Sequence, residues 1–157
     1  MPQRSTDNDF DRMTWHDNTL YGLRFDIGDT QRGQWHSNLV LDLDHIVEWV
    51  RDADGDMRFR VVPATLVFHD VTDLRIDVAF ADNACRTAIN EPSIDGITRR
   101  PVSDQKICLD RAYYRWRIAF NWPRGGEIAF GASGFTQTWR AAPLLLDQQR
   151  RGRFDTI

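Results

Sequence analysis

Hydrophobic and polar residues alternate along much of this chain, with the period of two that is typical of β-strands. Residues 59–80, FRVVPATLVFHDVTDLRIDVAF, contain two such runs, separated by a polar corner at residues 70–73. Leu66 and Phe68 share one face of the first run. The apolar positions on one face of the second run are Leu74, Ile76, Val78 and Phe80. The pattern predicts that these two runs form the centre of an antiparallel sheet.

Three further runs extend this prediction on both sides of the centre. Residues 21–27 and 39–50 alternate before it, and residues 114–122 alternate most regularly after it. Gly55 and Gly125 each end a three-residue loop, and glycine in the left-handed conformation is typical of such hairpins. We therefore expect a mainly β fold, in which a twisted antiparallel sheet built from hairpins curls into a sandwich or a partly open barrel.

The first of these loops, at residues 53–55, also predicts a strand register. It sets Glu48 opposite Arg60 across the hairpin, which is a favourable pair of opposite charges. Residues 45–50 fit either a strand or a helical turn, because six residues do not settle the period. Residues 131–134 contain two glycines, and a bulge there would explain why the apolar parity changes along the last strand.

The two ends of the chain differ from the alternating middle. Residues 1–12 are polar and have no apolar period, so we expect a mobile arm followed by a single β-rich domain over residues 13–157. Residues 81–92 have the least internal pattern and are expected to form a loop. Residues 143–152 predict a short helix that ends at its glycine and closes one end of the sheet.

The composition narrows the classes of function. The formal net charge is −3 and 41% of the residues are hydrophobic, which fits a folded domain and argues against nucleic-acid binding. There is no signal-peptide pattern and no apolar run of the roughly 18–20 residues that a membrane-spanning helix needs. We expect a cytoplasmic protein without a membrane partner, with Cys85 in a loop and Cys108 in a strand at residues 107–109, both as reduced thiols.

Three aspartates in the first hairpin loop raise the question of a calcium site. Asp52, Asp54 and Asp56 occupy alternate positions, as the first ligands of a calcium loop do. The later positions do not fit, because Met57 stands where such a loop needs glycine and Pro63 where it needs glutamate. The histidines and cysteines also lack the spacing of a zinc site. The sequence therefore favours a hairpin and predicts no metal and no cofactor.

The expected strand ends hold the first group of candidate site residues. His69 and Asp70 end the first central run, and Trp15 and His16 precede the first strand. Functional side chains often gather where loops leave a sheet. One hypothesis is therefore a pocket near His16, His69 and Asp70, with Trp15 lining a pocket or an interface. His45 shares the parity of its apolar neighbours and is expected to be a hydrogen-bonded core residue.

Asp42, Asp44 and Glu48 form the second candidate site. They share a parity within residues 39–50, opposite to the leucines, so a strand there carries an acidic outer stripe. Such a stripe favours a protein partner with a basic surface. The edge near residues 39–44 either pairs two chains into a homodimer or uses its acids to keep a monomer from pairing.

Three phrases in the sequence resemble a known group of proteins. WHDN at residues 15–18, LVLDLDHIVEW at 39–49 and PATLVFHDVTDLRI at 63–76 are similar to a family of uncharacterised bacterial single-domain proteins, a domain of unknown function. The resemblance covers roughly residues 15–140 and implies no catalytic residues, because the family has no assigned activity. More loosely, the order of strands is similar to that of small cytoplasmic immunity proteins that neutralise bacterial toxins.

Two classes of function follow from these observations. The first is a non-catalytic binding protein that binds a protein partner through the acidic stripe. An immunity-type protein is one example of this class. The acidic balance and the lack of a catalytic signature favour this first class. The alternative is a small-ligand-binding or enzymatic β domain with the pocket near His16, His69 and Asp70. No residue is predicted to be catalytic.

Overall fold

The computed structural model describes residues 3–81, 84–103 and 111–152. Two short 3₁₀-helices, η1 (Asp7–Arg12) and η2 (Thr30–Arg32), are the helical elements of these residues. The strands, in chain order, are β1 (Arg4–Thr6), β2 (Thr19–Ile27), β3 (Ser37–Arg51), β4 (Met57–His69), β5 (Thr72–Asp77), β6 (Ser93–Pro101), β7 (Tyr114–Trp122), β8 (Glu127–Ala132), β9 (Gly134–Trp139) and β10 (Leu144–Leu146). The mainly β class predicted from the sequence is confirmed.

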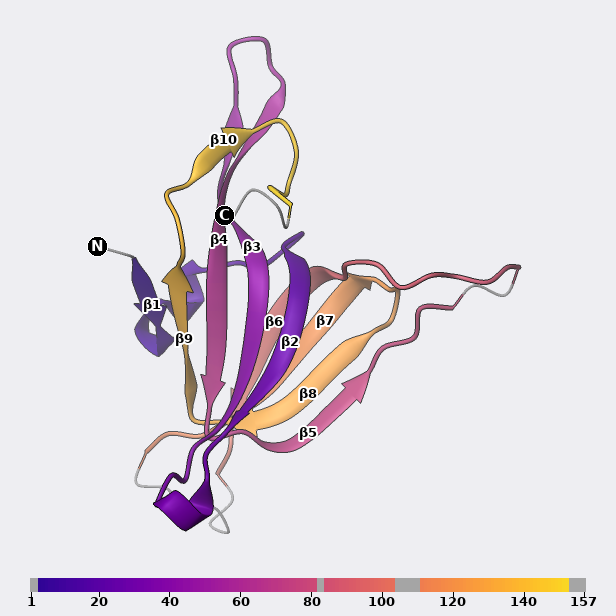
Figure 1. The fold of residues 1–157 in the computed structure, drawn as a ribbon. Helices are drawn as coiled ribbons and strands as arrows, with labels where there is room; N and C mark the ends of the chain where they lie inside the picture. The colour runs from indigo at the N-terminus through magenta and orange to yellow at the C-terminus, as the bar shows by residue number, and fades with distance from the viewer. Residues whose placement is uncertain (1–2, 82–83, 104–110, 153–157) are drawn as a thin grey trace.

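All ten strands belong to one antiparallel sheet that is not closed into a barrel (Figure 1). Its order is β1-β9-β4-β3-β2-β6-β7-β8-β5, and β10 pairs with β4 beyond the end of β9. The chain breaks its pairing at Ser133, where β8 ends beside β7 and β9 begins beside β4. The sheet therefore curls so that the same face of both halves is turned inward, and buried side chains from the two halves meet in one core.

The two halves of the sheet meet at a short junction. Thr19 pairs with Ser93, and this is the one pairing between β2 and β6 in the described residues. Two backbone hydrogen bonds of 2.9 Å reinforce the junction, one from Leu20 N to Pro92 O and one from Ile94 N to Asn18 O. Beyond it, β2 keeps its pairing with β3 on one side and has an open edge on the other.

The core is built from the alternating faces that the sequence predicts. Leu41 lies opposite Leu66, and both side chains are fully buried. The ring of Phe68 contacts the rings of Trp116 and Phe130, with centroids 5.0 and 4.7 Å apart. Burial of each such side chain contributes on the order of 1.5–3 kcal/mol. These contacts therefore fix which side of each strand faces inward.

The β3–β4 hairpin has the predicted register and a longer loop. Glu48 lies opposite Arg60, whose Nε is 3.2 Å from Glu48 Oε2. Gly55 has a φ of 83°, the left-handed conformation expected of it. The loop spans residues 52–56 rather than three residues, because the strands stop pairing earlier. Residues 45–50 form a strand and not a helical turn.

The second half of the expected central pair lies elsewhere in the sheet. β4 is central, between β3 and β9, but β5 pairs with β8 and forms an edge. Asp70 and Asp73 have φ values of 55° and 52°, in the left-handed region, where the chain turns away from β4. The prediction was wrong for residues 72–77, because alternation shows which side of a strand is buried and not which strand it pairs with.

The N-terminal segment has contacts that its polar composition did not predict. β1 pairs with β9, and Asp7 Oδ1 lies 3.0 Å from Arg99 Nη1. The ring of Phe10 meets that of Trp116 edge to face, with centroids 5.5 Å apart. These contacts give residues 4–12 a defined place against the core, where the sequence predicted a mobile arm.

The predicted C-terminal helix is wrong. Leu144–Leu146 forms β10, and residues 140–152 contain no helix. Because β9 ends at Trp139, the edge of β4 beyond it is open, and β10 pairs with that edge. Leu146 packs against the buried group Ile46, Phe59 and Val61. The strand predicted at residues 107–109, with Cys108, lies outside the described residues.

Candidate functional site

The acidic stripe predicted from Asp42, Asp44 and Glu48 does not form one face. β3 has a bulge at Val47, where its register against β4 shifts by one residue. Such a shift moves the following side chains to the other side of the sheet. Glu48 therefore lies on the face opposite to Asp42 and Asp44.

Each of these three acids also has a partner within the chain. Asp42 pairs with Arg140, and Glu48 pairs with its arginine opposite on β4. Asp44 is only 1% exposed and accepts a hydrogen bond from the Tyr21 hydroxyl at 2.8 Å. Burial, together with the hydrogen bond and charge of Asp44, raises the pKa of Tyr21 well above its ordinary value, so the hydroxyl stays a donor. The acids offer less free negative charge than the sequence predicts.

Trp15 and His16 precede β2 and lie in different surroundings. Trp15 is buried, and its Nε1 donates to Gln137 Oε1 at 2.8 Å. His16 is exposed, and its Nδ1 lies 2.9 Å from the backbone oxygen of Asp95. The His16 ring lies nearly parallel to that of Trp49, with centroids 6.5 Å apart. Trp15 is therefore a core residue, and His16 is a surface residue.

His69 and Asp70 lie at the end of β4 and bind separate partners. His69 Nε2 is 2.8 Å from Thr136 Oγ1, and partial burial lowers the pKa of His69. Asp70 accepts a hydrogen bond from Ser133 Oγ at 2.6 Å and pairs with Arg111 at 3.0 Å. Because Ser133 donates to Asp70, it does not form a nucleophile–base pair with the His69 ring.

The pocket hypothesis requires His16, His69 and Asp70 to converge, and the structure keeps them apart. His16 lies beside Trp49, which is opposite Phe59 near the start of β4, whereas His69 ends β4. A strand rises about 3.3 Å per residue, so positions 59 and 69 are roughly 33 Å apart. These three residues do not line one site.

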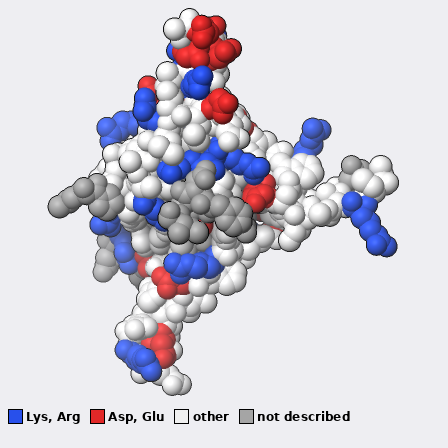
Figure 2. Space-filling model, turned by 45° about the horizontal axis from the view of Figure 1, so that its top comes forward, with Lys and Arg blue, Asp and Glu red and all other residues white. Residues whose placement is uncertain are grey.

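The aspartates of the β3–β4 loop serve the turn itself. Asp52 Oδ1 accepts the backbone N–H groups of Asp56 at 2.9 Å and Asp54 at 3.0 Å, and Asp52 Oδ2 pairs with Arg58 at 3.2 Å. The hydrogen bonds from the Asp56 N–H and from Arg58 lower the pKa of Asp52. Figure 2 shows acidic side chains at the tip of the projecting hairpin and arginines across the middle of the face below it. The hairpin prediction accounts for this segment.

A groove that the sequence did not predict lies along the open edge of β2, and we call it the β2–β5 groove. Its larger cavity, of about 540 Å³, lies between residues 20–23 of β2 and a segment that includes Phe80 and residues 89–92. Its smaller cavity, of about 230 Å³, lies between the end of β2 and residues 71–74. The start of β2 faces Phe80 and residues 89–92, and the end of β2 faces residues 71–74. The groove therefore runs between β2 and the segment that contains β5.

Apolar side chains are exposed on the walls of the β2–β5 groove. Phe25 and Ile27 of β2, which line the smaller cavity, are 57% and 71% exposed. Ile76 of β5, which lines neither cavity, is 47% exposed. Leu23 and Leu74 are half-buried and pack against the core. The alternation seen in the sequence is therefore present on both strands, but their inner faces are not fully covered.

The strands that border the β2–β5 groove also have unpaired edges. Within residues 3–81, 84–103 and 111–152, no strand pairs with β2 on this side beyond Thr19, and none pairs with the outer edge of β5. An open edge presents backbone N–H and C=O groups that can pair with another strand. The sequence showed the alternating faces, but alternation does not reveal whether a further strand covers them.

In the part of the chain that the structure describes, no group of three or more His, Cys, Asp or Glu side chains is arranged to hold a metal ion. No helix in that part is long and apolar enough to cross a membrane.

No family model, no curated protein and no solved structure matches this chain. The resemblance to the uncharacterised bacterial family, and the looser similarity to immunity proteins, stay predictions.

Proposed function

We propose that this protein is a non-catalytic binding domain that takes an extended segment of a protein partner into the β2–β5 groove. The observation that carries the proposal is the exposed apolar side chains on two strands whose edges are open, above all Phe25, Ile27 and Ile76. In this proposal the curled sheet acts as a partly open barrel, and the groove is its open side.

Strand addition explains why apolar walls and open edges occur together. A partner segment laid along β2 or β5 would pair with backbone groups that have no strand partner in the described structure. Alternate side chains of that segment would enter the two cavities, which supplies specificity. A long apolar edge left open favours aggregation, so a partner that covers it also protects the domain.

The acidic surface has a smaller part in this proposal than the sequence suggests. Asp42, Asp44 and Glu48 are paired within the chain, so they offer little free charge to a basic partner. Asp54 and Asp56 at the projecting hairpin tip are exposed acids that would favour a partner with a basic surface near the groove-binding segment. Neutralisation of a toxin is the specific form of partner binding that the sequence resemblance suggests.

Affinity capture with matched variants tests this function. The full chain serves as bait in lysate of the source cell, as the wild type, as Phe25→Asp in the groove, and as Val47→Asp on the hairpin outside it. Both substituted side chains are partly exposed, so both variants are expected to fold. We expect a stoichiometric protein partner that the wild type and Val47→Asp retain and Phe25→Asp loses.

Other outcomes of the same experiment contradict the proposal. A partner lost with Val47→Asp and kept with Phe25→Asp would place binding on the hairpin. Absence of any stoichiometric partner would reject a protein-binding role. A bait that captures a second copy of itself, checked by sedimentation, would show that the groove forms a homodimer.

The larger cavity favours a second candidate function, the binding of a small apolar molecule. Its volume of about 540 Å³ lies within the range of small-molecule sites, roughly 300–1,000 Å³. Leu20, Leu23, Phe80, Ile89 and Pro92 give it apolar walls. Native mass spectrometry of the purified protein separates the two functions. A bound molecule at one per chain, lost with Phe80→Asp, would favour the small-ligand function.

A further inference from the structure

The C-terminal end of the described chain, residues 147–152, is attached to other parts of the fold by polar contacts. Gln149 Nε2 donates to Asp17 Oδ2 at 2.9 Å. Arg150 Nη1 lies 3.7 Å from Glu91 Oε2. These contacts connect a basic tail to acidic side chains that are distant in the sequence.

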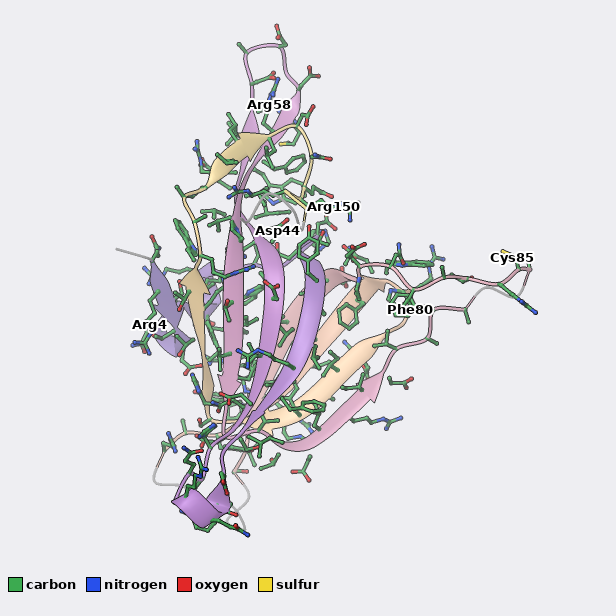
Figure 3. The ribbon with its side chains drawn as sticks, viewed as in Figure 1. Arg4, Asp44, Arg58, Phe80, Cys85 and Arg150 are labelled. Carbon is green, nitrogen blue, oxygen red and sulfur yellow. The ribbon has the colours of Figure 1, made fainter. Side chains whose placement is uncertain are left out.

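The closest of these attachments is at Asp44. Its buried carboxylate accepts the backbone N–H groups of Arg151 at 2.7 Å and Gly152 at 3.2 Å, besides the hydroxyl of Tyr21. Gly152 has a φ of 93°, a conformation that glycine adopts without strain. A carboxylate withdrawn from water is stable only when donors of this kind satisfy it. Figure 3 shows Asp44 and Arg150 near the upper end of β2.

The tail contacts two walls of the larger cavity of the β2–β5 groove. Tyr21 lies on the β2 wall, and its hydroxyl also accepts the Gly152 N–H at 3.2 Å. Glu91 lies on the facing wall and pairs with Arg150. Near the junction, Leu20 N donates directly to Pro92 O across these walls. The tail therefore bridges the cavity just beside that junction.

We infer that residues 147–152 form a strap that holds residues 89–92 against β2 and thereby sets how far the larger cavity opens. The strap is anchored on Asp44 by the backbone N–H groups of Arg151 and Gly152, and the Arg151 side chain adds a hydrogen bond from Nη1 to Ala142 O at 3.2 Å. It is a property of the free protein, and it stands whether or not the groove binds a partner.

Hydrogen exchange of the full chain tests the strap with two substitutions at one position. Arg151→Pro removes the N–H that Asp44 accepts, whereas Arg151→Ala keeps the N–H and removes only the side chain. We expect exchange of the Leu20 amide, which donates to Pro92 O, to rise by about tenfold or more in Arg151→Pro, because residues 89–92 open locally when the Asp44 anchor is lost. In Arg151→Ala, which keeps that anchor and loses the hydrogen bond from Nη1 to Ala142 O, the rise is expected to be clearly smaller.

Two results would overturn the strap. Equal exchange of the Leu20 amide in Arg151→Pro and Arg151→Ala would show that the Asp44 anchor does not hold residues 89–92 against β2. A rise of the same size in the central strands β3 and β4 would show general destabilisation instead of local opening. Neither result bears on partner capture by the groove, which is measured separately with Phe25→Asp.

Discussion

Asn18 Nδ2 lies 2.8 Å from His45 Nδ1 in the buried region beside the β2–β3 pair. Asn18 Oδ1 accepts the Ile46 N–H at 3.1 Å, and this hydrogen bond fixes the orientation of the Asn18 amide. Asn18 therefore donates to His45, and the imidazole is neutral with its proton on Nε2. His45 is the hydrogen-bonded core histidine that the sequence predicts.

This contact predicts a loss of stability in mild acid. Burial lowers the pKa of His45 from 6.5 to about 4, so between these values the unfolded chain binds a proton that the folded protein does not. The stability that neutral His45 contributes to the folded protein is fully present above pH 6.5. As the pH falls toward 4, the free energy of unfolding decreases by roughly 3 kcal/mol. Denaturant unfolding at a series of pH values measures it.

His45→Gln is the matched control for that measurement, because glutamine can accept from Asn18 and does not titrate. The difference in unfolding free energy between wild type and His45→Gln should shrink as the pH falls from 6.5 to 4. A difference that stays constant over this range would refute the assignment.

Replacing Trp15 should lower the free energy of unfolding, because the Trp15 side chain makes a buried hydrogen bond to Gln137. In Trp15→Phe, Gln137 Oε1 loses its donor while remaining fully buried. An unsatisfied buried group costs about 1–3 kcal/mol, in addition to the lost ring volume. Trp49→Phe, at an exposed position, is the control and should cost clearly less in chemical denaturation. Equal losses would mean that the hydrogen bond contributes nothing.

Local features of the fold were predictable from the sequence because they depend on neighbouring residues. The inward faces of β4 and β7 follow from alternation, and the opposition of Glu48 and Arg60 follows from a hairpin loop with an odd number of residues. Gly55 and Gly125 have the positive φ values, 83° and 78°, that their turns require. In each case the determining contacts lie within one hairpin.

Features that depend on distant contacts were not predictable in the same way. Asp44 has the parity of an exposed acid, but the tail at Arg151 covers it from more than a hundred positions away. The bulge at Val47 reverses the face of Glu48, and no glycine or proline marks it. Alternation places Phe25 on the apolar face of its strand, but only the fold shows that no described strand covers it.

Replacing Arg99 with lysine should destabilise the fold, although lysine has the same charge. Its guanidinium lies 4.3 Å from the ring centroids of both Phe10 and Tyr114, and its side chain is 15% exposed. Lysine keeps the charge but cannot stack as a plane or keep the same geometry toward Asp7. Arg99→Lys should lower the unfolding free energy by about 1–2 kcal/mol, whereas Arg100→Lys at an exposed neighbour should change it little. Thermal and denaturant unfolding of both variants decide the point.

Gly134 predicts how the N-terminal segment is held, because a side chain there would collide with Asp7. A Cβ at Gly134 would lie 1.9 Å from Asp7 Oδ2, and Asp7 cannot move freely while it pairs with Arg99. Gly134→Ala should therefore displace residues 4–12 and cost about 1–3 kcal/mol, whereas Gly96→Ala, with open space around its Cβ, should cost less.

A double-mutant cycle separates that collision from a general effect of alanine in the strand. In an Asp7→Ala background the carboxylate is gone, so Gly134→Ala should cost much less than in the wild type. Amide exchange across Arg4–Thr6, which pairs with β9, should rise in Gly134→Ala alone relative to Gly96→Ala. If Gly134→Ala costs the same in both backgrounds, the collision with Asp7 is not what requires glycine at this position.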